Sequence, residues 1–220
     1  MAATNAAIQT LSVSISLLAS GGIAALSLFD VLELKSQPAS RSLPSIRWLF
    51  SRGSHIFPTA AGLACSGFTY LAYGALPASS RSMLQLLRLG TNSTKVNGYL
   101  AAAALAISIA PVTTLLMIPT NFELIKMNEE KGGARSAESA RVGSHDFQPG
   151  QRSAEDSVDG VGEANQFADL TGPQTETPRK STVEDDEKTR ALLDKFGKMN
   201  FSRAVLIGAG GVVGLWTSLM

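Results

Sequence analysis

The chain has 220 residues, of which 45% are hydrophobic, and a formal net charge of +1 at pH 7. These averages fit a soluble domain as well as a membrane protein, so the arrangement of residues along the chain has to decide between them. One cysteine, Cys65, excludes an internal disulfide or a Cys-x-x-Cys redox pair, and two histidines exclude a His-rich metal site. We therefore expect no metal and no cofactor, and we expect no nucleic-acid partner.

The first predicted element is a membrane helix at 6–29, a run without charged residues. Its few polar side chains recur at helical spacing and should turn toward other helices, where hydroxyls find partners; they are Gln9, Ser12, Ser16 and Ser20. A cleaved signal peptide is the alternative. No Lys or Arg precedes the run, and it is long for such a peptide, so a membrane helix is favoured.

The second predicted span covers 56–76 and follows a polar link, 30–55, that is rich in Ser and Arg. Trp48 lies beside arginines near the end of this link, as is typical of a membrane interface. Two tyrosines, Tyr70 and Tyr73, lie near the far end of the span. Their position fits either interface anchors or the lining of a site.

The third span, 99–118, is an unbroken run of uncharged residues, and the short loop 77–97 precedes it. Twenty helical residues rise about 30 Å, which matches the hydrocarbon core of a bilayer. Pro111 predicts a kink, with hydroxyls of the following threonines available to nearby carbonyls. After Pro119 the sequence Thr120–Glu123 resembles a capping box, which predicts that a new short helix begins there.

Residues 127–190 differ from the rest of the chain. They contain 14 acidic and 8 basic residues, against 4 acidic and 11 basic residues elsewhere. They are rich in Gly, Ser and Glu and have few large apolar side chains, which predicts a disordered acidic loop acting as a solvated tether. An amphipathic approach helix should then lead into the last span, 204–220.

The glycines of the last span, Gly208–Gly214, superficially resemble a dinucleotide-binding loop. The spacing is wrong for that fingerprint, and no strand–helix–strand unit surrounds them. Gly210 and Gly214 instead form a Gly-x-x-x-Gly face. We interpret this face as a site of close helix packing.

Together these elements predict an all-α fold, a bundle of four transmembrane helices with a long disordered loop between helices 3 and 4. The expected organisation is 1–126 for helices 1–3, 127–190 for the loop, and 191–220 for the approach helix and helix 4. Basic residues concentrate in the links 30–55 and 122–203, which predicts that these links are cytosolic and both termini lumenal, in an endomembrane. The glycosylation sequon at Asn92 would then lie on the lumenal side.

A set of residues in the third span resembles the fungal anthrone oxygenases, a family of small four-helix membrane proteins. The pattern is Pro111-x-Thr113-Thr114-x-x-Met117-x-Pro119-Thr120-Asn121-x-x-Leu124. Trp48, Arg52, Gly53 and Pro58 are similar to the start of the family's second helix, and Leu192, Leu193, Asn200 and Arg203 to the start of its fourth. The resemblance covers 10–126 and 190–217. The chain departs from the family at Phe196, near which a tryptophan is usual.

The resemblance implies oxidation of an anthrone to an anthraquinone by O2 in an aromatic polyketide pathway, without flavin, haem or metal. The partners are then a polycyclic aromatic substrate, O2 and the lipid bilayer, with pathway enzymes as further partners. Such a reaction needs a base, hydrogen-bond donors for a developing oxyanion and a flat apolar pocket.

Candidates for these roles lie at the predicted helix ends. His55 is the first choice for the base because its unperturbed pKa is near 6.5, and Asp30 is a weaker alternative. Arg52 and Arg203 are candidates to hold a phenolate or enolate, and Asn121 to donate to the substrate carbonyl. An ordinary role remains open for each, as an interfacial histidine, as snorkelling arginines and as a helix cap.

Two other classes of function stay open from the sequence. A membrane scaffold could use the acidic loop as a docking arm for pathway enzymes. A small transporter is a weaker alternative, because no charged residue lies within the four predicted spans and no internal repeat is visible.

Overall fold

The computed structural model describes residues 2–88, 93–143 and 148–220, and all regular structure in these residues is helical. His145 and the sequon residue Asn92 lie outside the described residues. The α-helices are α1 (Ala2–Ala25), α2 (Val31–Lys35), α3 (Ala39–Gly74), α4 (Met83–Leu86), α5 (Thr94–Ile107), α6 (Ile109–Pro111), α7 (Ile118–Glu130), α8 (Ala137–Gly143), α9 (Ala154–Asp159) and α10 (Val183–Leu219). Among the described residues, the π-helices η1 (Leu26–Asp30) and η4 (Val112–Met117) and the 3-10 helix η2 (Ala78–Ser80) join them.

Three stretches among the described residues are long and apolar enough to cross a membrane, Ala3–Lys35, Thr94–Glu130 and Val183–Leu219. The predicted second span lies in the latter part of α3, where Pro58, Thr69 and Tyr70 make the run less apolar. By length and apolar composition, the described residues therefore contain three candidate spans, and the predicted second span is not one of them. The predicted all-helical fold of a membrane protein is confirmed at this coarser level.

The chain divides into two compact units. Unit 1 comprises Met1–Ala25, Ile56–Thr113 and Asn200–Met220, and unit 2 comprises Leu26–His55 and Thr114–Met199. The long helices α3 and α10 contribute to both units, since the boundaries fall after His55 and after Met199.

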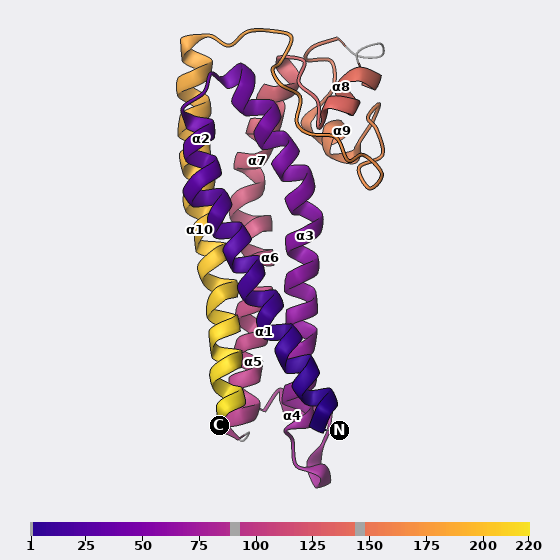
Figure 1. Ribbon diagram of the computed structural model, residues 1–220, viewed down its shortest axis with the longest axis vertical. Coiled ribbons are helices and arrows are strands. Elements are labelled where there is room, and N and C mark those ends of the chain that lie inside the picture. Colours follow the sequence, from indigo (N-terminus) through magenta and orange to yellow (C-terminus); the bar gives the residue numbers. More distant parts are fainter. Residues whose placement is uncertain (1, 89–92, 144–147) are drawn as a thin grey trace. The chain divides into compact units, whose positions relative to one another are not determined.

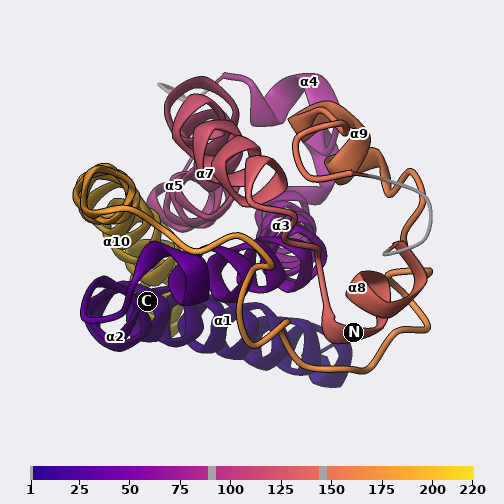
Figure 2. The same ribbon diagram turned by 90° about the horizontal axis from the view of Figure 1, so that it is seen from above.

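Unit 1 is a helix bundle packed through small residues. Figures 1 and 2 show α1, α3, α5 and α10 running side by side. Alanines from α3 and α5 make up much of its buried core, around the fully buried ring of Phe68. Leucines such as Leu11, Leu18 and Leu63 face outward instead. A bundle with small residues inside and large apolar residues outside is what a lipid surround favours.

The glycines of α10 allow this close packing. A Cβ added to Gly210 would lie 3.0 Å from the carbonyl oxygen of Ala102 in α5, and one added to Gly214 would lie 2.3 Å from the ring of Phe68 in α3. Gly208 and Gly211 lie equally close to α1. The interpretation of these glycines as a packing face is confirmed.

The third apolar run continues as a helix beyond its predicted end. Pro111 is followed directly by η4, and the hydroxyl of Thr113 donates to the carbonyl of Ile109 at 2.7 Å, as expected after a helix proline. The predicted capping box after Pro119 is wrong, because α7 begins at Ile118 with no side-chain cap. Pro119 lies in the first turn of α7, where a missing N–H costs little.

Unit 2 has its own apolar core. It is formed by α2, the start of α3, α7 and the start of α10, with Leu43, Ile46, Leu124 and Leu193 fully or almost fully buried. Phe196 is buried here and meets the ring of Phe50 edge-on at 5.1 Å. Instead of a separate approach helix, α10 runs without a break from Val183 to Leu219.

The structure does not confirm a disordered segment at 127–190. In its described part, α7 extends to Glu130, α8 and α9 follow, and α10 begins at Val183 (Figure 1). Buried ion pairs of Arg135 and Arg152 with Glu129 and Glu163 hold much of this segment. A prediction from hydrophobic content does not detect such contacts.

Candidate functional site

The most suitable site for a flat apolar ligand is a cavity of about 620 Å³ in unit 1. Helices α3, α4 and α5 form its walls, with lining residues Thr69, Met83, Leu86, Leu87, Asn97, Leu100, Ala101 and Ala104. The volume falls in the usual range for small-molecule sites, which are mostly apolar with a few polar groups.

Two polar side chains, Thr69 and Asn97, belong to this lining. The hydroxyl of Thr69 donates to the carbonyl of Cys65 at 2.8 Å, so its proton serves the helix backbone. Asn97 has an amide group with two N–H donors. An amide N–H of this kind can donate to a carbonyl or an oxyanion of a ligand.

Sequence reasoning missed Asn97 because it assigned 77–97 to a loop. Helix α5 begins earlier, at Thr94, and Ser93 caps it by accepting a hydrogen bond from the Val96 amide at 3.4 Å. A serine three residues before an apolar position is a signal for a helix start, and would have placed Asn97 in the first turn. The apolar residues of α4 in the same loop were a second signal.

Two of the candidates from the sequence, Arg52 and His55, lie on one face of α3 in unit 2. The guanidinium of Arg52 donates to the carbonyls of Gln166, Asp169 and Thr171. The centroid of the His55 ring lies 4.8 Å from the centroid of the Phe167 ring. Arg52 and His55 thus both contact the loop 165–171, which belongs to the segment that was predicted to be a tether.

Asn121 and Asp30 also belong to unit 2. Asn121 lies in α7, and its side-chain oxygen is buried and accepts no hydrogen bond from the described residues. Asp30 is exposed at the end of η1. Because no enclosed site of the described residues surrounds this exposed carboxylate, the structure gives little to favour Asp30 as a base.

Arg203 is a buried residue of α10 in unit 1. Its guanidinium donates to Asn200 at 2.9 Å, and the Asn200 amide donates to the carbonyl of Ile23 at 3.0 Å. The Ile23 carbonyl lies just before η1, where the regular helical hydrogen bonding changes. These contacts tie α10 to α1.

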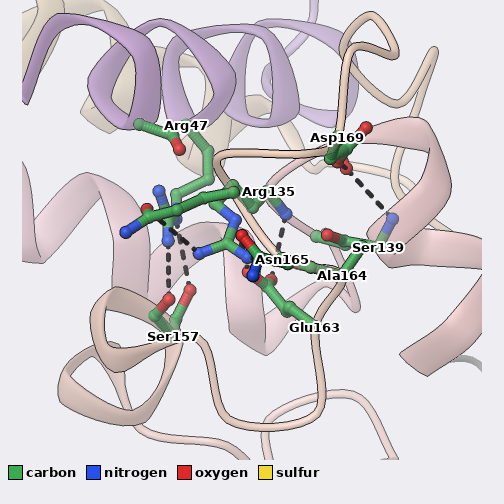
Figure 3. A network of polar contacts seen from close by, with 12 residues as sticks. Arg47, Arg135, Ser139, Ser157, Glu163, Ala164, Asn165 and Asp169 are labelled. Carbon is green, nitrogen blue, oxygen red and sulfur yellow. Dashed lines mark hydrogen bonds and ion pairs between the residues drawn. The ribbon is translucent and has the colours of Figure 1, made fainter. Parts of the chain in front are cut away.

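Unit 2 contains a buried network of charged residues (Figure 3). Arg152 makes a two-pronged ion pair with Glu129 at 2.8 and 2.9 Å and also contacts Glu163 at 2.8 Å. Arg135 reaches the other oxygen of Glu163 at 3.0 Å. Because each buried carboxylate faces a guanidinium, burial of these charges is tolerated.

Arg47 belongs to the same region and donates to the backbone and the hydroxyl of Ser157 at 2.7 and 3.2 Å (Figure 3). Burial lowers the pKa of the Arg47 guanidinium to about 10, although Glu163 opposes this shift. The arginine remains charged at neutral pH. It fastens α9 to α3, which is a structural role.

In the described part of the chain, no group of three or more His, Cys, Asp or Glu side chains is placed to hold a metal ion.

The comparisons agree with the resemblance drawn from the sequence. Residues 47–148 match the family model described as anthrone oxygenase. This match supports the anthrone oxygenase family, and it covers every residue lining the apolar cavity, together with Arg52, His55 and Asn121. The resemblance at 10–46 and 190–217 lies outside the match and stays a prediction. No curated protein and no solved structure matches the chain.

Proposed function

We propose that this protein oxidises an anthrone to an anthraquinone with O2, and that the anthrone occupies the cavity between α3, α4 and α5. The observation that carries the proposal is the family match over 47–148. The cavity supports it, because a tricyclic aromatic molecule needs an apolar space of this kind.

The proposed reaction converts the central methylene of the anthrone to a carbonyl. A base removes one methylene proton, and the resulting anion passes an electron to O2. The carbon radical and superoxide combine to a peroxide at that carbon, and loss of water leaves the second carbonyl. Overall, one anthrone and one O2 give one anthraquinone and one water.

Asn97 is proposed to act on the oxygen of the substrate. When the methylene loses its proton, negative charge moves to the existing carbonyl oxygen. An amide N–H beside that oxygen stabilises the anion more than the neutral ketone, which lowers the barrier to deprotonation.

The residues selected from the sequence keep proposed roles. None of them lines the cavity, so their roles are an alternative to it: His55 is proposed as the base, Arg52 and Arg203 as groups that hold a phenolate or enolate, and Asn121 as a second donor. The contacts of Arg52 to three carbonyls favour a structural role for it instead.

A bilayer setting is part of the proposal. We propose a fourth span in the latter part of α3, both termini in the lumen of an endomembrane, and a place in aromatic polyketide synthesis, with pathway enzymes supplying the anthrone. O2 and a polycyclic substrate both concentrate in lipid.

The test is to fill the cavity. Ala101→Phe adds a ring to the lining of the cavity, whereas Ala7→Phe adds the same ring to an exposed position of α1. We expect the first variant to lose at least tenfold in anthrone oxidation by reconstituted protein and the control to keep the wild-type rate. Equal rates of anthrone oxidation in the two variants would show that the anthrone does not occupy this cavity.

A further inference from the structure

The 165–171 loop of unit 2 is a compact turn with a well-bonded backbone. The amides of Ala168 and Asp169 donate to the carbonyl of Asn165 at 3.1 and 2.8 Å. The carboxylate of Asp169 accepts from the amide and the hydroxyl of Thr171 at 2.9 and 2.7 Å, and from the hydroxyl of Ser136. This turn is therefore fixed internally.

One face of α3 holds the 165–171 loop from outside. Trp48, Arg52 and His55 follow one another at helical spacing, so their side chains point the same way. The indole of Trp48 donates to the carbonyl of Thr171 at 2.9 Å, and Arg52 and His55 make the contacts given above. The guanidinium of Arg52 also lies over the ring of Trp48, 5.5 Å from its centre.

This firmly held loop nevertheless exposes large apolar side chains. Phe167 is 75% exposed and Leu170 is 90% exposed. A mobile loop could fold such side chains inward, but a bonded turn presents them permanently. Exposed large apolar groups on a fixed turn mark a surface that meets something apolar.

The position of the 165–171 loop along α3 identifies what it meets. His55 is the last residue before the uncharged run that begins at Ile56 in α3. Phe167 packs on His55, so it lies at the level where this run begins. Tryptophan and arginine beside such a boundary are typical of a bilayer interface.

We propose that the 165–171 loop is an interfacial anchor, which inserts Phe167 and Leu170 into the headgroup and upper acyl region of the bilayer. Trp48, Arg52 and His55 are then the residues that position the anchor. This inference rests on the fold and the membrane setting, and it holds whether or not the protein oxidises anthrones.

The experiment uses the full chain in phosphatidylcholine vesicles, with Cys65→Ala removing the native thiol. Phe167→Cys and Leu170→Cys are each labelled with an environment-sensitive fluorophore. Val183→Cys is the matched control, because Val183 is also 75% exposed. It begins α10, directly before the acidic residues Glu184, Asp185 and Asp186 and 21 residues before the last apolar run, 204–220. Quenching is compared between iodide in water and a lipid spin-labelled near the top of its acyl chain.

We expect lipid quenching at positions 167 and 170 to exceed that at 183 at least threefold, and iodide quenching to be correspondingly weaker. Labels at 167 or 170 that iodide reaches as freely as at 183 would overturn the proposal. Labels shielded from both quenchers would also overturn it, since a protein partner would then cover the loop. Helical content measured by circular dichroism confirms that each labelled chain is folded.

Discussion

Gly214 shows how the absence of one side chain permits close packing in unit 1. A Cβ at this position would lie 2.3 Å from the ring of Phe68, which is fully buried and cannot easily move. Gly62 in α3 is a contrasting case, because a Cβ there would meet no atom within 4 Å. Two glycines of the same bundle thus have opposite sensitivity to substitution.

We expect Gly214→Ala to destabilise the bundle by about 1–3 kcal/mol through overpacking. Gly62→Ala should be neutral or stabilising by up to about 1 kcal/mol, because alanine is the better helix former. Thermal unfolding in detergent, followed by circular dichroism, measures both. A Gly214→Ala variant as stable as Gly62→Ala would contradict the packing described for Phe68.

Asn97 is the residue on which the proposed chemistry depends most directly. We expect Asn97→Leu to lower kcat for anthrone oxidation by about 10²-fold, because one donor to the oxyanion is lost while the apolar walls remain. Substrate binding should change much less. The measurement is steady-state oxidation in membranes with spontaneous oxidation subtracted. A raised KM with unchanged kcat would show that Asn97 only binds the substrate.

At the scale of elements, the segment between α7 and α10 is held to unit 2 by buried ion pairs. Arg152 faces two carboxylates, Glu129 and Glu163, and its removal leaves both partly unpaired. An exposed pair in the same segment, Arg141 with Glu138, makes the natural comparison.

We expect Arg152→Met to destabilise unit 2 by about 3–5 kcal/mol, since uncompensated charges stay buried. Arg141→Met should leave the stability almost unchanged, because exposed pairs contribute little. Hydrogen exchange of backbone amides in 129–163 measures the two effects. Similar protection in both variants would mean that the network is not formed in solution.

The 165–171 loop should also respond to acid. Although burial raises it, the pKa of the Asp169 carboxyl lies below its ordinary value, because the hydrogen bonds from Ser136 and Thr171 favour the ionised form. A lowered pKa in the folded state means that ionised Asp169 stabilises the loop above its unfolded pKa, about 3.9, and that this contribution disappears as the pH falls through the folded value.

We therefore expect the amide of Thr171 to be protected from exchange at pH 6 and to lose protection below about pH 4. Asp169→Asn removes the titration and should show the same protection at both pH values, once intrinsic exchange rates are corrected. Wild-type protection that does not change with pH would contradict this role of Asp169.

At the scale of the whole molecule, the sequence predicted correctly those features that follow from a single strong local pattern. Long uncharged runs predicted the helices of unit 1, and the spacing of Gly210 and Gly214 predicted a packing face. The prediction that a new helix starts after Pro119 was wrong. A proline interrupts a helix only where its N–H would have donated to a helix carbonyl, and in the first turn of α7 no such hydrogen bond is needed.

The remainder depends on contacts between distant residues, which leave no local pattern. Arg47 binds Ser157, and Glu129 binds Arg152, across loops whose composition indicated disorder. The cavity was missed for a similar reason, because it needs α4 and the first turn of α5 to lie against Thr69. Of the cavity lining, the sequence placed only Thr69, in the run 56–76, and Leu100, Ala101 and Ala104, in the run 99–118, on predicted helices.

The central claim is that this chain uses O2 to oxidise an anthrone, and isotope incorporation tests it most directly. Membranes containing the protein, and matched membranes without it, are given an anthrone under ¹⁸O2, and the anthraquinone is analysed by mass spectrometry. We predict formation well above the empty membranes, with one ¹⁸O atom per product molecule. Formation no faster than in the empty membranes would contradict the account for that substrate.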